Sequence, residues 1–145
     1  MHDLPRQLTV ERLEELFEGR TLLVEKLAEH EDPLGSAHKV IAQLSEHEKL
    51  EALNAHPAIG ASNLSVRSAA EQGVGGDPAL LTELAYQNQV YEEKFGFRFV
   101  VFVNRRSKAE ILDVLRARLE NTREEELDTA LRELVAIAED RWRHS

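Results

Sequence analysis

Apolar side chains recur at every third or fourth position over most of the chain, which is the spacing of an α-helix. The first such segment runs from Val10 to Phe17, where Thr9 is suited to cap the N-terminus and Gly19 to end the helix. The same spacing predicts further helices over residues 21–30, after Ser36, from Ser45 to His56, from 78 to about 94, from Ser107 and from Thr122.

Four segments begin with the pattern Ser/Thr-x-x-Glu, a capping box in which the two side chains bond each other's backbone amides. The pairs are Ser45 with Glu48, Ser68 with Glu71, Ser107 with Glu110, and Thr122 with Glu125. The second pair follows a loop predicted for residues 57–67 and opens only a short helical turn, because "GVGG" comes directly after it.

Residues 95–103, "FGFRFVVFV", depart from the helical pattern. Aromatic and β-branched residues are typical of a strand, but no other segment offers a partner, and a lone strand leaves its backbone groups unpaired. Two interpretations stay open: a buried extended segment, or the start of a helix overridden by packing. The predicted fold class is all-α, with seven or eight helices in a single compact domain over residues 1–145.

The composition limits the classes of function. A chain of 145 residues can bury a hydrophobic core that is stable without disulfides or a structural metal. The absence of cysteine excludes disulfides, thiolate metal sites and a cysteine nucleophile. We see no signal peptide and no apolar run long enough to cross a membrane, so we expect a cytoplasmic protein. The net charge of −9 disfavours binding to nucleic acid, and an anionic ligand would need a local group of arginines.

His56 is the first candidate for chemistry. The residue before a proline is pushed out of the helical region, so His56 ends its helix and Pro57 holds the backbone that presents the ring. Histidine suits general acid–base catalysis because its pKa lies near neutrality. The alternative is a surface histidine that interacts favourably with the C-terminal end of the helix.

The capping box at Ser68 and Glu71 has two compatible interpretations. The two side chains can simply satisfy each other's backbone amides, or the helix start can also receive an anion. Gln72 adds an amide that both donates and accepts hydrogen bonds.

Arg118 lies on the apolar stripe of its helix, three residues after Leu115 and four after Val114. A charge at such a position is usually paired or bound to a ligand, and the alternative is an arginine reaching solvent from the edge of the stripe. The six histidines do not form a metal-binding spacing, and we expect no metal and no organic cofactor.

Four stretches in this order resemble the 2-oxo-4-hydroxy-4-carboxy-5-ureidoimidazoline (OHCU) decarboxylases of uric acid breakdown. They are "AHPAIG", "SAAEQ", "YEEKFGFRFVVFVNRRSKAEILDVLRARLEN" and "ELDTALRELVAIAEDRW". The resemblance covers most of the chain. It implies an all-α homodimer that decarboxylates a small-molecule substrate without a cofactor and yields (S)-allantoin.

The resemblance also implies roles for individual residues. His56 would be the catalytic acid or base, assisted by Glu71. The residues expected to bind the substrate are Pro57, Ser68, Gln72, Phe99, Val101, Val103 and Arg118, with Phe99 to Val103 acting through backbone groups. Many members have proline where Arg98 stands here. If Arg118 is instead engaged in an internal salt bridge, Arg67 or Arg98 is the next candidate for the substrate carboxylate.

Two other functions are compatible with the same residues. One is a non-catalytic helical module that binds a ligand or a partner. The other is an enzyme of this fold that acts on a related hydantoin or ureide.

Overall fold

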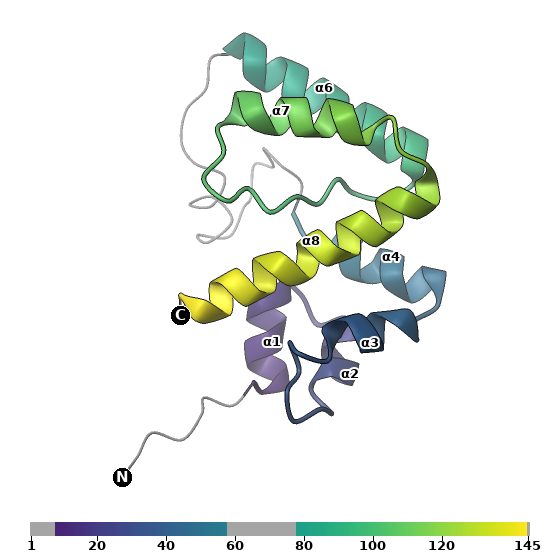
Figure 1. Cartoon of the computed structure of the whole chain (residues 1–145), viewed down its shortest axis with the longest axis vertical. Coiled ribbons are helices and arrows are strands. Elements are labelled where there is room, and N and C mark those ends of the chain that lie inside the picture. The colour runs from purple at the N-terminus through teal and green to yellow at the C-terminus, as the bar shows by residue number, and fades with distance from the viewer. Residues whose placement is uncertain (1–7, 58–77, 145) are drawn as a thin grey trace.

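The computed structural model describes residues 8–57 and 78–144 (Figure 1). Within these ranges the chain forms helices and no strand, so the predicted all-α fold class is confirmed. The helices are α1 (Val10–Phe17), α2 (Leu22–Leu27), α3 (Ala37–Ala42), α4 (Glu46–Ala55), α6 (Pro78–Phe95), α7 (Lys108–Arg118) and α8 (Arg123–Arg143).

The long helix α8 connects two groups of helices. Helices α6 and α7 pack side by side at one end of the molecule, and α1, α2, α3 and α4 pack together at the other (Figure 1). Helix α8 contacts α1, α3 and α4, and its buried face carries leucine, isoleucine, valine and alanine into the common core. No helix among the described residues combines the length and apolar character that a membrane span requires.

The helix boundaries largely follow the predicted caps. Thr9 caps α1, and the capping boxes that begin at Ser45, Ser107 and Thr122 all form. Helix α2 is shorter than the predicted 21–30, because the chain passes into tight turns after Leu27. The capping box at Ser68 lies outside the described residues.

The segment at residues 97–103 is extended and buried, without a partner strand among the described residues. The interpretation as a buried extended segment is therefore confirmed, and the alternative that a helix begins here is wrong. Gly96, with φ +82°, lets the chain leave α6 in a left-handed conformation that other residues rarely adopt. In Figure 1 the segment runs beneath α6 and α7 on the side facing α8.

Side chains from three parts of the chain replace the missing partner strand. Asn54 Oδ1 accepts a hydrogen bond from the Arg98 amide at 3.2 Å, and Glu133 Oε1 accepts one from the Phe102 amide at 3.1 Å. Arg118 Nη1 donates to the Val100 carbonyl at 2.7 Å. Buried backbone groups must be paired, and this segment is paired by side chains rather than by a ladder.

Aromatic rings fix the beginning of the extended segment. The Tyr91 ring on α6 lies 4.7 Å from the Phe95 ring, 5.9 Å from the Phe97 ring and 5.2 Å from the Phe99 ring, measured between centroids. Tilted and edge-to-face pairs at these distances add stability beyond the area they bury. The cluster therefore holds Phe97 and Phe99 against α6.

Candidate active site

His56 lies at the C-terminal end of α4, as the sequence predicts. Its φ of −78° and ψ of 135° are those of extended backbone, and its amide still donates to the Leu53 carbonyl at 3.2 Å. Ala52 and Leu53 anchor this end of α4 in the core. The residue is only 8% exposed, so the alternative of a surface histidine is wrong.

The imidazole of His56 is held in its neutral form. Burial lowers its pKa to about 4, and the positive charge of Arg141 acts in the same direction, as does Arg98 more weakly, whereas Glu18 opposes them. Nδ1 is buried and has no hydrogen-bond partner in the described part of the chain. A neutral, buried ring nitrogen without a partner is suited to exchange a proton with a bound molecule.

Arg98 fastens the extended segment to the end of α4. Its Nη1 donates to the His56 carbonyl at 2.7 Å, beside the bond from its own amide to Asn54. Its Nε lies 3.9 Å from Glu92 Oε1 on α6. Arg98 thus brings the segment at 97–103 next to His56.

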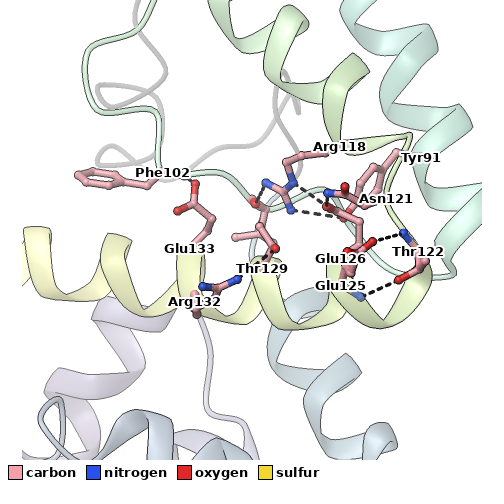
Figure 2. Close-up of polar contacts among 11 residues, drawn as sticks. Tyr91, Phe102, Arg118, Asn121, Thr122, Glu125, Glu126, Thr129, Arg132 and Glu133 are labelled. Atoms are coloured by element: carbon pink, nitrogen blue, oxygen red, sulfur yellow. Dashed lines mark hydrogen bonds and ion pairs between the residues drawn. The ribbon is translucent and has the colours of Figure 1, made fainter.

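A buried ion pair supports the same segment from the other side (Figure 2). Arg118 Nε donates to Glu126 Oε1 at 2.8 Å, and the two side chains are 8% and 0% exposed. Tyr91 Oη donates to the same carboxylate oxygen at 2.5 Å, and Asn121 Nδ2 donates to Glu126 Oε2 at 2.8 Å. With Arg118 Nη1 on the Val100 carbonyl, the cluster joins α6, α7, α8 and the extended segment.

The cluster has the charge states that such burial requires. Burial, together with the hydrogen bond to Glu126, raises the pKa of Tyr91, so the phenol stays protonated and acts as a donor. The guanidinium carbon of Arg118 also lies 4.7 Å from the centroid of the Phe99 ring, a favourable cation–π distance. The Glu126 carboxylate and the Arg118 guanidinium therefore form an ion pair whose polar neighbours are all hydrogen-bonded to it.

The structure brings together part of the predicted site. His56, Pro57 and the extended segment adjoin through Arg98, and Arg118 grips that segment at Val100. The side chains of Phe99, Val101 and Val103 are buried in the core. Their backbone is therefore what they can offer a ligand, as the resemblance implies.

Four predicted residues are not placed. Ser68, Glu71 and Gln72, together with Arg67, lie outside the described residues. The internal salt bridge considered for Arg118 is present, and a contact between Arg118 and a ligand stays a prediction.

Sequence reasoning missed four residues around His56 and Arg118. Glu126 follows a capping box and looks like an ordinary acid in the first turn of a helix. Asn54 and Glu18 carry no pattern that singles them out. Arg141 follows Ala138 by three residues and so lies on the apolar stripe of α8, a signal that could have found it.

Other polar groups of the described residues do not add to this site. A surface cavity of about 490 Å³ lies between α3, α4 and α8 and is lined partly by His38, Lys49, Asp128 and Arg132, with none of the predicted site residues. Within residues 8–57 and 78–144, no three histidine or acidic side chains are grouped so as to hold a metal ion.

The family model described as OHCU decarboxylase matches residues 2–143. Over 107 residues the chain is 37% identical to the uric acid degradation bifunctional protein TTL of Arabidopsis thaliana, an alignment that covers 67% of this chain and 33% of the relative. It is 32% identical to a 2-oxo-4-hydroxy-4-carboxy-5-ureidoimidazoline decarboxylase of Halalkalicoccus jeotgali, over 68% of this chain and 58% of the relative. The chain thus spans about a third to three fifths of the length of these relatives.

Solved structures share the fold. An OHCU decarboxylase crystallised in the presence of (S)-allantoin has a TM-score of 0.74 and 28% sequence identity, with 88% of this chain and 92% of that chain covered. A structure of (S)-allantoin synthase has a TM-score of 0.68 at 23% identity, with 92% of this chain and 52% of that chain covered, and so supports the fold alone.

The lowered pKa of His56 predicts a loss of stability in acid. Between pH 6.5 and 4 the unfolded chain binds a proton on His56 that the folded chain does not, so the free energy of unfolding decreases as the pH falls. From pH 7 to pH 5 this group should cost roughly 2 kcal/mol. In urea unfolding, the free energy of unfolding should fall between pH 7 and pH 5 by roughly 2 kcal/mol more in wild type than in His56→Gln. The matched control His47→Gln, at an exposed position of the same helix, should behave as wild type. Equal pH dependence in all three proteins would contradict the assignment.

Removing Arg118 should destabilise the fold far more than removing its neighbour Arg116. Arg118→Met leaves Glu126 buried and uncompensated, which typically costs 3–5 kcal/mol. Arg116→Met, on the same helix, breaks only an exposed pair with Glu83 and should cost about 1 kcal/mol or less. Denaturant unfolding at pH 7 measures both, and similar losses in the two variants would refute a special role for the buried pair.

Proposed function

The chain belongs to the OHCU decarboxylase family, and from that premise we propose that it converts 2-oxo-4-hydroxy-4-carboxy-5-ureidoimidazoline to (S)-allantoin in uric acid degradation, as a carbon–carbon lyase without a cofactor. The observation that carries the proposal is the state of His56. It is buried, neutral and without an Nδ1 partner among the described residues, at the Pro57 turn that the resemblance assigns to the catalytic histidine. A solved member of similar fold, crystallised in the presence of (S)-allantoin, supports the choice of product.

In the proposed reaction, the bond between the ring carbon and the carboxylate breaks and CO₂ leaves. The electron pair passes into the conjugated imidazoline ring, and a proton then adds to one face. Because the ring itself takes up the electrons, the chemistry needs an oriented and desolvated carboxylate and a proton carrier rather than a metal.

His56 is the proposed proton carrier. Since its pKa is near 4, the imidazole is neutral at the start of a cycle near neutral pH, so it first accepts the proton of the substrate hydroxyl and then delivers it to the carbanionic ring carbon. We propose that Glu71 steadies the imidazolium formed in between, and that Ser68 and Gln72 hydrogen-bond the substrate.

Arg118 is the proposed partner of the substrate carboxylate. Two of its donors make short hydrogen bonds, Nε to Glu126 at 2.8 Å and Nη1 to the Val100 carbonyl at 2.7 Å. The third, from Nη2 to Tyr91 Oη, is longer, at 3.4 Å. This longest bond is the one that a substrate carboxylate would replace at least cost. The same arginine would then support the segment and hold the ligand.

We also propose a homodimer in the cytoplasm. The resemblance supports the dimer, and the composition is compatible with that compartment. Light scattering of the purified chain tests the dimer.

Turnover of freshly generated OHCU is the direct test of the activity. Coupled urate oxidase and hydroxyisourate hydrolase supply the unstable substrate, and circular dichroism follows the appearance of (S)-allantoin. His56→Asn should lower kcat by ~10²–10⁴-fold, the usual contribution of a general acid or base. His47→Asn should keep the wild-type rate. A wild-type protein without turnover would favour the binding-module alternative, and turnover of a related ureide instead would change the substrate.

Arg118→Lys tests the carboxylate contact separately from folding. Lysine keeps the charge but lacks the planar fork that holds a carboxylate in two parallel bonds. Loss of a charge-assisted hydrogen bond worth roughly 1.5–3 kcal/mol should lower kcat/KM about ten- to a hundredfold in the folded variant. An unchanged kcat/KM with a lower melting temperature would restrict Arg118 to its structural role and direct attention to Arg67 and Arg98.

A further inference from the structure

Helix α4, which ends at His56, has a short apolar contact with the core. Of its ten residues only Ala52 and Leu53 are buried, and Leu50 packs against the core half-buried. A surface helix usually carries an apolar stripe along its whole length. These three residues lie within about one turn, so apolar packing fixes a point on α4 better than the direction of its axis. Polar contacts along the helix must therefore help to set where His56 lies.

Side chains from other elements hold the first part of α4. Glu46 Oε1 accepts a hydrogen bond from Arg123 Nη1 at 2.6 Å, and Arg123 Nε donates to the Phe95 carbonyl at 3.0 Å. Glu51 Oε1 accepts a hydrogen bond from the Leu22 amide at 2.9 Å. The first part of α4 is thereby tied to the end of α6, to the start of α8 and to α2.

Arg98 bonds the C-terminal end of α4 at two points. Its amide donates to Asn54 Oδ1 at 3.2 Å, and its Nη1 donates to the His56 carbonyl at 2.7 Å. The last carbonyls of a helix have no partner within the helix, and Pro57 has no amide hydrogen to offer. Two bonds to positions two residues apart fix a direction as well as a distance. Arg98 therefore sets the orientation of the peptide that joins His56 to Pro57.

The same arginine belongs to the extended segment, whose backbone is proposed to meet the substrate. Its side chain is 38% exposed, and its Nε lies 3.9 Å from Oε1 of Glu92, which is 45% exposed. Exposed pairs of this kind contribute little to the stability of a fold. What Arg98 does instead is to join two parts of the candidate site, because it bonds the end of α4 from within residues 97–103.

We propose that Arg98, assisted by Asn54, is a positioning residue for His56, which holds the backbone of the histidine at a fixed distance from the extended segment so that the imidazole meets the bound substrate in one orientation. The catalytic meaning of this contact rests on the proposed function. A small displacement of a catalytic group lowers the rate of the chemical step, whereas the contacts that bind the substrate remain. Arg98 thus acts on kcat and not on KM.

The test compares Arg98→Met with Arg123→Met in the full chain. Arg98→Met keeps the backbone amide and removes the donor to the His56 carbonyl, so it should lower kcat about ten- to a hundredfold and leave KM within about twofold. At pH 7 the loss of the Arg98 charge does not alter the protonation of His56, because burial is the largest cause of its pKa of about 4. Arg123→Met breaks two hydrogen bonds at the other end of α4 and should keep the wild-type kcat.

Two further measurements separate positioning from a general structural effect. Lysine keeps a donor and the charge, so Arg98→Lys should recover most of the kcat that Arg98→Met loses. Amide nitrogen relaxation, measured by NMR, reports the rigidity of His56 without any turnover. The order parameter of the His56 amide should fall from the rigid value of about 0.85 toward 0.6 in Arg98→Met. It should keep its wild-type value in Arg123→Met.

A wild-type kcat in Arg98→Met overturns the proposal, as does an equal loss of kcat in Arg123→Met. A raised KM at unchanged kcat also overturns it, and would make Arg98 a contact of the substrate carboxylate. If Arg98→Met does not fold, Asn54→Leu decides, because it removes only the acceptor of the Arg98 amide; it should lower kcat, and a wild-type kcat overturns the proposal. A lowered order parameter at His56 in a protein that does not turn over OHCU supports the Arg98 contact and refutes only the proposed function.

Discussion

The ion pair between Arg118 and Glu126 is the contact on which the candidate site depends. A guanidinium and a carboxylate out of water are stable only when every remaining donor and acceptor is satisfied. Here Tyr91 and Asn121 complete the carboxylate, and the Val100 carbonyl and the Phe99 ring receive the guanidinium. Because the partners come from α6, α7, α8 and the extended segment, one charge pair fixes how these parts meet. The extended segment then reaches His56 through Arg98.

The surroundings of His56 illustrate how a helical protein can hold a buried histidine in its neutral form. The helix ends at His56, directly before Pro57. The core removes water from the ring, and the charges of Arg141, Glu18 and Arg98 adjust its affinity for a proton. Burial is the largest of these effects on the pKa, which falls to about 4. The same burial lowers stability in acid, so the neutral imidazole and the acid sensitivity have one cause.

Local patterns in the sequence predict the parts of this arrangement that depend on neighbours in the chain. The capping boxes at Ser45, Ser107 and Thr122, the helix end at His56 and the position of Arg118 on an apolar stripe all follow from spacing. Contacts between distant positions do not, because periodicity reports a face and not what packs on it. For that reason the sequence does not predict that Glu126 pairs with Arg118 or that Glu18 pairs with Arg141. Residues 97–103 have the composition of a strand because they are buried, and only the tertiary structure shows that side chains supply their hydrogen bonds.

The central claim is that the buried pair holds the extended segment in place. Amide hydrogen exchange under native conditions tests it most directly, in Arg118→Met compared with Arg116→Met. The account predicts that the amides of Arg98 and Phe102, which bond Asn54 and Glu133, exchange faster in Arg118→Met by a larger factor than the buried amides of α2. In Arg116→Met both sets should keep their wild-type protection. An equal increase at all of these amides in Arg118→Met would contradict the account, because the pair would then stabilise the whole fold without a particular hold on the segment.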